Sequence, residues 1–211
     1  MLHPAPPGLA APPLFWEVLE RRRTVRFYTE DPVDGEVVTR LMRAAVMAPS
    51  AHNGQPWRFV VLNDRARRQR LVSAMAKRWE RDLRKSDVDP KIIRAEVRFS
   101  TERFVNAPLL LLPCLTMESM DRYPDRARQR AEYAMAIQSV AAGIQNLLLA
   151  AHAEGLGACW CCAPLFCQGL VRRLLDLPPD WAPQALITLG RPRHDPPVPP
   201  RRSLAELTWT L

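Results

Sequence analysis

The sequence lacks the patterns that mark many catalytic and membrane-bound protein classes. Its longest apolar stretch, PLLLLPCL at Pro108–Leu115, is too short to span a bilayer. No charged, apolar and small-residue leader opens the chain, so we expect a cytoplasmic protein. It contains no G-x-S-x-G turn and no phosphate-binding P-loop. Gly155-Leu156-Gly157 lacks a third glycine and precedes a predicted strand, which argues against a Rossmann dinucleotide site.

Metal-ligand spacing is also missing. The four histidines form no H-E-x-x-H motif and no close pair. Four of the five cysteines crowd into Cys159–Cys167, but C-x-C-C-x4-C is neither the C-x2-C pair of zinc knuckles nor an iron–sulfur spacing. We expect these cysteines to be small buried hydrophobic residues. We therefore predict no metal site. With no evident nucleophile or general base, a bound cofactor is expected to carry any chemistry.

Lysine is scarce, whereas arginine is abundant. Only three of the 30 basic residues are lysines, and the net charge is +8. Because arginine binds phosphate and planar oxygens bidentately, the excess could serve a nucleic acid, a phosphorylated ligand or an anionic metabolite. The alternative is a solvated surface that reflects coding bias. The charge total by itself favours that alternative.

Hydrophobic periodicity and turn residues predict one domain of mixed helices and strands. The 211 residues, 47% of them hydrophobic, suffice for one sizeable core. Residues 1–13 hold five prolines and are predicted to be a flexible lead-in. The arm at residues 191–211 begins with five more prolines over 191–200, which exclude a helix or a central strand there. Long helices between strands indicate a three-layer helix–sheet–helix domain over residues 14–211. The predicted helices are Leu14–Arg23, Glu36–Met47, Asn63–Arg84 with Asn63 as its cap, Pro90–Phe104, Arg126–Ala153 and Leu165–Leu175, and the predicted strands are Trp57–Leu62, Leu109–Leu115, Leu156–Cys162 and Gln184–Leu189.

Two arginine-rich segments could bind an anion. Arg23 and Arg26, with the Thr24 hydroxyl, could clamp a phosphate through charge-assisted hydrogen bonds. The alternative is that they are cations placed at a helix C-terminus, which the helix dipole favours, and this segment by itself favours that alternative. Arg201 and Arg202 could close over a phosphate, but by themselves they are better explained as part of a solubilising tail.

Two further segments could approach a planar ring. The loop Pro49–Trp57 (PSAHNGQPW) gathers a hydroxyl and two carboxamides, which suit the edge of a pyrimidine-like ring. The alternative is an Asx-turn that only connects two elements, and the density of polar groups favours a site. The small residues of Gly155–Ala158 could let a ring approach the backbone, although a helix C-cap gives the same pattern.

Taken in order, these four features resemble the nitroreductase family of FMN enzymes. RRRTVRFYTEDPV is similar to the family's R-R-S-x-R-x-F signature, with Thr24 in the serine position. APSAHNGQPWRFVVL is similar to its P-S-x-x-N-x-Q-P-W loop and strand, and GLGACW with the late arginine pair completes the set. The resemblance implies an α+β fold with a mainly antiparallel sheet between helices. It also implies an intertwined homodimer that exchanges its C-terminal arms.

The resemblance further implies an FMN site at residue level. The arginine segments would hold the phosphate and ribityl chain, and the carboxamide loop would reach the flavin from the partner subunit. The backbone after GLGACW would face the reactive flavin N5. Many family members carry an acidic residue and glycine there, so Cys162 and Ala163 are a departure. The implied cofactor contacts are Arg22, Arg23, Thr24, Arg26, Pro49, Ser50, Asn53, Gln55, Cys161, Cys162, Ala163, Arg201 and Arg202.

Three stretches look most similar to one branch of the family: MAKRWERDL, RYPDRARQRAEY and LVRRLLDLPPDWAPQALITLG. That branch is the reductase domain that follows a γ-glutamyl ligase domain in deazaflavin-coenzyme biosynthesis. The resemblance implies a free-standing reductase that passes a hydride through flavin N5 to a dehydro precursor of that coenzyme, with NAD(P)H or a reduced deazaflavin as donor. Open alternatives are a broad NAD(P)H-dependent nitroaromatic or quinone reductase, an oxygen-dependent benzimidazole synthase that consumes flavin, and an arginine-rich nucleic-acid-binding module. We expect a homodimer with neither nucleic acid nor membrane as partner.

Overall fold

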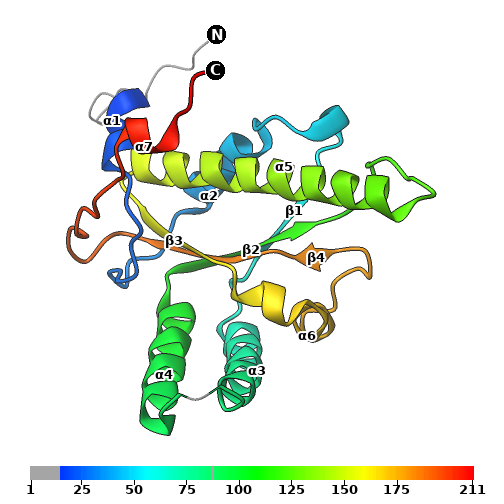
Figure 1. Ribbon diagram of the computed structural model, residues 1–211. Coiled ribbons are helices and arrows are strands. Elements are labelled where there is room, and N and C mark those ends of the chain that lie inside the picture. Colours follow the sequence, from blue (N-terminus) through cyan, green and yellow to red (C-terminus); the bar gives the residue numbers. More distant parts are fainter. Residues whose placement is uncertain (1–14, 87) are drawn as a thin grey trace.

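The computed structural model describes residues 15–86 and 88–211 (Figure 1). The predicted lead-in over residues 1–13, and the predicted helix start at Leu14, lie outside the described residues. The elements in chain order are α1 (Phe15–Arg21), α2 (Gly35–Val46), η1 (Ala51–Asn53), β1 (Trp57–Val61), α3 (Arg65–Leu83), α4 (Pro90–Asn106), β2 (Leu109–Leu115), α5 (Arg126–Ala153), β3 (Gly157–Cys161), η2 (Ala163–Phe166), α6 (Gln168–Leu174), β4 (Ala182–Pro183), β5 (Leu186–Gly190) and α7 (Leu204–Leu207).

The strands form one antiparallel sheet in the order β1-β2-β5-β3, with the short β4 also paired to β2. The strand β2 lies in the middle and is buried at every position. Its side chains alternate between the two faces: Leu109 and Leu111 pack with α2 and α5, whereas Leu110 and Leu112 pack with α3 and α6. A strand covered on both faces needs an unbroken apolar run, which explains LLLLPCL. The three-layer architecture and the antiparallel sheet are confirmed.

The helix α5 is the main element of one layer. It covers one face of the sheet together with α2, while α3, α4 and α6 lie across the other face (Figure 1). Asp125 caps α5, because its side chain accepts a hydrogen bond from Arg128 N at 2.9 Å. In the described part of the chain, α5 is the one helix long and apolar enough to cross a membrane by composition. Its packing against α2 and the sheet is that of the core helix of a soluble fold.

A buried arginine holds the opposite layer to the sheet. Arg68 of α3 is only 6% exposed, and its guanidinium donates to Leu62 O at 2.8 Å, to Val105 O at 3.3 Å and to Ala107 O. These carbonyls lie just after β1 and at the end of α4. One side chain therefore ties the start of α3 to both neighbouring connections, which keeps α3 and α4 side by side below the sheet (Figure 1).

Several predicted element boundaries were wrong by a few residues. The first helix ends at Arg21 rather than Arg23, because the chain becomes extended to reach β3. The cap of α3 is Asp64, whose side chain accepts from Arg67 N at 2.8 Å, and not Asn63. The single helix predicted at Leu165–Leu175 is η2 followed by α6, since the backbone of Cys167 between them is not helical, with φ of −151° and ψ of 35°. The last predicted strand begins later, at Leu186, after the separate β4.

The C-terminal arm starts beside the segment that follows α1. Thr29 N donates to Arg191 O at 2.9 Å, and Arg193 N donates to Phe27 O at 3.1 Å, on either side of a bridge between Tyr28 and Pro192. Beyond these bonds the arm stays extended to the short α7, whose capping box is built on Ser203. Exchange of this arm between protomers remains a prediction.

Replacing Tyr28 with phenylalanine is expected to lower the free energy of unfolding by about 1–2 kcal/mol. The buried Tyr28 hydroxyl contacts Thr188 Oγ1 at 2.7 Å and donates to Val25 O at 2.6 Å, so its loss leaves buried partners unsatisfied. Urea unfolding measures the change. Tyr123→Phe is the control, because the Tyr123 hydroxyl makes only a long 3.4 Å contact at the surface. Equal losses in the two variants would contradict the prediction.

Candidate functional site

The arginine segment, residues 22–26, lies along the edge strand β3. After α1 ends, Thr24 pairs with Ala158 in a parallel bridge, and Val25 N donates to Ala158 O at 2.9 Å. Val25 is buried, whereas Thr24 is exposed. The close approach requires glycine at position 157, because a Cβ there would lie 2.5 Å from the Val25 side chain. The sequence GLG therefore serves to bring the Arg22–Arg26 backbone against β3.

Arg22, Arg23 and Arg201 lie near one another at the start of this segment, and no carboxylate in the described part of the chain balances their charge. Arg21 pairs with Glu17 at 3.0 Å, but within the described residues no carboxylate pairs with Arg22, Arg23 or Arg201. Partial burial, followed by repulsion from Arg23 and Arg201, lowers the pKa of Arg22. Arg23 also has a buried Nε with no partner in the described part of the chain. The cluster of Arg22, Arg23 and Arg201 is thus a concentration of positive charge that an anion would relieve.

His152, near the end of α5, lies close to this arginine cluster. Its pKa is lowered first by burial and then by the charges of Arg22, Arg23 and Arg21. The imidazole is consequently neutral at neutral pH and adds no further repulsion. The arginine cluster therefore lies near the C-terminal end of α5.

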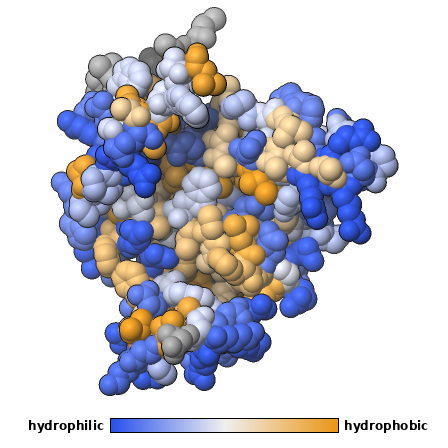
Figure 2. All heavy atoms as spheres, in the orientation of Figure 1, coloured by the Kyte–Doolittle hydropathy of each residue, from blue (hydrophilic) through white to orange (hydrophobic). Residues whose placement is uncertain are grey.

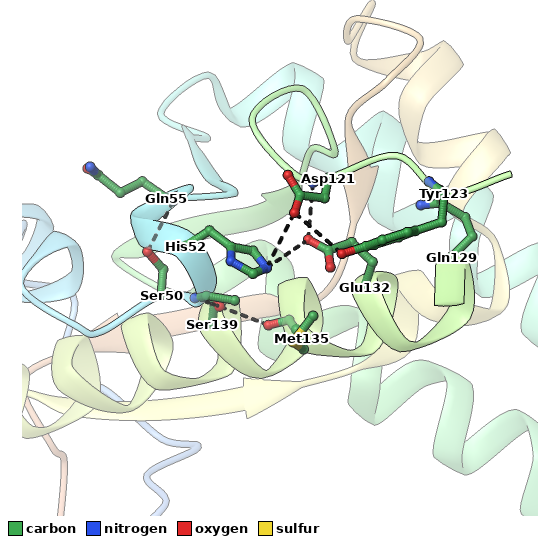
Figure 3. Close-up of polar contacts among 10 residues, drawn as sticks. Ser50, His52, Gln55, Asp121, Tyr123, Gln129, Glu132, Met135 and Ser139 are labelled. Atoms are coloured by element: carbon green, nitrogen blue, oxygen red, sulfur yellow. Dashed lines mark hydrogen bonds and ion pairs between the residues drawn. The ribbon is translucent and has the colours of Figure 1, made fainter. Parts of the chain in front are cut away.

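The carboxamide loop lies much further along the same helix. Ala51 N donates to Ser139 Oγ at 3.2 Å, which fixes the loop thirteen positions before His152, or about 20 Å at the helical rise of 1.5 Å per residue. Gln55 N donates to Ser50 Oγ at 3.1 Å, and the Gln55 side chain points away from the helix (Figure 3). Pro49, Asn53 and Gln55 are all exposed. One chain therefore does not bring this loop to the arginine cluster.

The segment after β3 lines an apolar cavity of about 550 Å³. Cys161, Cys162 and Ala163 form one wall, and side chains of α3 and α4 form the others. Figure 2 shows apolar surface gathered on this face over η2 and α6, above α3 and α4. The volume suits a planar organic ligand. The aromatic lining comes from Trp79, Phe104 and Phe166, and the charged lining includes Arg78, Asp82 and Arg103.

The cysteines at this wall correct one expectation. Cys159 is buried, as predicted for a small hydrophobic residue, but Cys162 is exposed because β3 ends and the chain turns into η2 there. Although the residue is exposed, partial burial of its thiol, followed by the neighbouring Cys161, raises the pKa of Cys162. It is therefore protonated at neutral pH and is a poor nucleophile. The cavity wall thus offers backbone and uncharged sulfur rather than a reactive thiolate.

Two of the expected phosphate contacts do not contribute to the charge around Arg22. Arg26 lines a second cavity of about 410 Å³ beside α4, together with Phe99 and Arg193. Arg201 and Arg202 are both exposed, and of this pair it is Arg201 whose charge lowers the pKa of Arg22. The structure therefore groups Arg22, Arg23 and Arg201 and separates Arg26 from them. The sequence analysis missed Trp79, Phe104 and Phe166, because apolar positions on helices are also the ordinary signature of a core.

Comparison with known proteins decides the family. The model of the nitroreductase family matches residues 19–191, which is most of the chain. This chain belongs to the nitroreductase family. Its members are flavin-dependent enzymes, so the chain is a flavin oxidoreductase.

Named relatives within the nitroreductase family cover nearly the whole chain. A 5,6-dimethylbenzimidazole synthase of Rhodospirillum rubrum is 34% identical over 197 residues, which are 89% of this chain and 85% of that protein. A nitroreductase structure from Desulfovibrio desulfuricans, solved in complex with FMN, is 26% identical with a TM-score of 0.73, covering 94% and 97% of the two chains. A BluB-like flavoprotein of Clostridium difficile shares the fold with a TM-score of 0.79 at 22% identity, covering 93% and 98%.

Proposed function

We propose that this nitroreductase-family chain binds FMN and transfers a hydride through flavin N5 to a dehydro precursor of the deazaflavin coenzyme. The observation that carries the proposal is the 550 Å³ cavity beside Cys161–Ala163. It is an apolar space with aromatic walls and arginines, next to the segment expected to face N5. Such a space suits a second substrate that combines a flat ring with an anionic tail.

The residues present suit the phosphate end of FMN. Arg22, Arg23 and Arg201 lack carboxylate partners among the described residues, and the buried Arg23 Nε has no acceptor. A dianionic phosphate would supply acceptors to all three guanidinium groups and relieve their repulsion. When bound, FMN supplies a two-electron hydride carrier at N5. The chain's own part is to hold the phosphate, present backbone at Cys161–Ala163 and exclude water around the acceptor in the cavity.

The ring end of FMN requires a second copy of the chain. The Ser50, Asn53 and Gln55 loop lies about 20 Å along α5 from the arginine cluster, so we infer that the partner's loop completes each site. Large exposed apolar side chains support an interface: Phe15 and Trp16 of α1, and Leu204 and Trp209 of the arm. All five cysteines are free thiols, which suits a homodimer working in the reducing cytoplasm.

A second candidate function is oxygen-dependent synthesis of 5,6-dimethylbenzimidazole. The 34% identity to the Rhodospirillum rubrum synthase favours it. In that reaction the flavin itself is consumed, so no large second substrate would have to occupy a cavity next to it. The aromatic cavity beside Cys161–Ala163 is the feature that this candidate leaves unexplained, and for that reason we rank it second.

Anaerobic mixing of the reduced, FMN-loaded protein with the dehydro precursor is expected to reoxidise the flavin and give a product with two more hydrogen atoms. Rapid-mixing absorbance and mass spectrometry measure the two changes, and parallel mixing with NADPH, NADH and reduced deazaflavin identifies the donor. Formation of 5,6-dimethylbenzimidazole in air without turnover of the precursor would establish the second candidate. Fast reduction of nitrofurans without turnover of the precursor would establish a broad reductase.

Point variants test whether the cavity, rather than the rest of the site, binds the acceptor. Trp79→Ala is expected to lower kcat/KM for the precursor about tenfold, because a lost aromatic contact costs about 1 kcal/mol or more, while FMN stays bound. Ile92→Ala is the control, since Ile92 is 55% exposed on α4 and does not line the cavity. Unchanged turnover in Trp79→Ala would place the acceptor elsewhere.

A further inference from the structure

A histidine and two carboxylates meet beside the carboxamide loop. His52 comes from η1, Asp121 from the loop after β2, and Glu132 from α5, and their side chains point toward one another (Figure 3). His52 Nε2 lies 3.5 Å from Glu132 Oε1 and 4.0 Å from Asp121 Oδ2. One donor atom from each residue falls within 4.8 Å of the other two. The three side chains therefore converge on one small volume.

The buried carboxylate in this cluster lacks a full set of partners. Glu132 is 0% exposed, although carboxylates are rarely buried without a counter-charge. Its Oε1 accepts a hydrogen bond from Asp121 N at 3.1 Å. Its Oε2 is buried with no partner in the described part of the chain, and no lysine or arginine there pairs with this carboxylate. The Oε1 atom of this buried carboxylate faces the imidazole of His52, its Oε2 atom has no partner, and a second carboxylate lies close by, so the side chain points to a bound cation.

The donor set and its spacing fit a divalent transition metal. Two donors of a tetrahedral ion with bonds of about 2.0–2.2 Å lie about 3.4 Å apart, close to the observed 3.5 Å between His52 and Glu132. The Asp121 Oδ2 atom lies 4.0 Å from His52 Nε2, and the exposed Asp121 side chain can move to complete the set. One imidazole nitrogen with two carboxylate oxygens is a ligand set for zinc, manganese or iron rather than for a soft thiophilic ion.

We propose that His52, Asp121 and Glu132 bind a divalent transition-metal ion that ties the carboxamide loop to α5. In the single chain the open coordination positions would face solvent, since His52 and Asp121 are exposed. The loop needs such a tie, because His52, Asn53 and Gln55 all have positive φ, of 54°, 52° and 46°. An ion at this point would hold the loop that carries Ser50, Asn53 and Gln55, and its role would be structural.

Cobalt titration of the full-length, chelator-dialysed protein tests the site. We expect one Co²⁺ bound per chain, with visible d–d bands and no thiolate-to-cobalt bands, because no cysteine is a ligand. Removing even an outer partner of a metal ligand costs about 10- to 100-fold in affinity. His52→Ala and Glu132→Gln should therefore each weaken binding by more than about 100-fold. His194→Ala is the control, since His194 lies in the arm near Phe27, away from the cluster.

Thermal melting provides a second measurement if Glu132→Gln folds poorly. Cobalt or zinc should raise the Tm of the wild type and of His194→Ala, but not that of His52→Ala, whose replaced side chain is half exposed. The proposal is overturned if the wild type binds no Co²⁺, if His52→Ala binds it as tightly, or if thiolate bands show that Cys161, Cys162 or Cys167 are the ligands. In those cases His52 and Glu132 make only a polar contact, with no metal ion between them.

Discussion

The double variant Arg22→Ala/Arg23→Ala is expected to bind FMN at least about 100-fold more weakly than the wild type. Each hydrogen bond from a charged group contributes about 1.5–3 kcal/mol, and about 1.4 kcal/mol corresponds to a factor of ten. Both guanidinium groups lie in the cluster with Arg201, where no carboxylate among the described residues would compete for them. Titration of the apoprotein, followed by flavin fluorescence, measures the change.

Riboflavin distinguishes loss of the phosphate site from loss of the fold. It has the ring and ribityl chain but no phosphate, so its affinity should change little in the double variant. Arg21→Ala is the matched control, because Arg21 belongs to the same run but is exposed and paired with Glu17 at 3.0 Å. Equal loss of FMN and riboflavin binding, or an FMN affinity within threefold of the wild type, would refute the assignment of this cluster to the phosphate.

Local sequence patterns predicted the helices and strands well, because the residues that start and stop each element lie next to it in the sequence. The helix α5 was predicted with its observed bounds, since Tyr123-Pro124-Asp125 sets its start and Glu154-Gly155 its end. The strand β2 was also predicted as observed, because seven apolar residues follow the stop at Asn106-Ala107-Pro108. The cap of α3 was misplaced by one residue because Asn63 and Asp64 are both good capping residues. Only the geometry decides between such neighbours.

Arg22 and Arg23 were named from one arginine-rich run, and Arg201 was named from a second run that the family resemblance linked to the first. The fold places the charge of Arg201 near Arg22. The cluster of His52, Asp121 and Glu132 was missed, because its members are far apart in the sequence and match no spacing motif. The prediction of no metal site rested on such spacings alone. The acceptor cavity was missed for a related reason: it needs α3 and α4 packed side by side, and no local pattern specifies that contact.

Membership of the nitroreductase family fixes the cofactor class but not the acceptor. Similarity to deazaflavin-biosynthesis reductases suggested one acceptor, whereas the Rhodospirillum rubrum synthase, at 34% identity, suggests another. Residues of the cavity wall, such as Cys162 and Ala163, are where we expect the two candidate functions to differ. Substrate tests on cavity variants are accordingly more informative than tests on the arginines.

Gly157→Ala is expected to destabilise the protein by about 1–3 kcal/mol, the usual cost of overpacking. The added Cβ would lie 2.5 Å from both Cβ and Cγ2 of Val25, and the branched Val25 side chain cannot rotate out of the way because its Cβ is fixed to the backbone. The Val25 segment must then move from β3, which weakens the 2.9 Å bond from Val25 N to Ala158 O. For a chain of this size the Tm should fall by about 2–12 °C.

The same substitution should also weaken FMN binding, because Val25 shares one short segment, which β3 holds in place, with Arg22 and Arg23, the arginines proposed to bind the phosphate. Gly35→Ala is the matched control: a Cβ at Gly35 meets nothing within 4 Å, and alanine at the first residue of α2 should leave the Tm unchanged or raise it slightly. If Gly157→Ala keeps the wild-type Tm and FMN affinity, contact between β3 and the arginine segment does not position the phosphate site. A lower Tm with unchanged FMN affinity would mean that the arginines are placed by α1 and the arm instead.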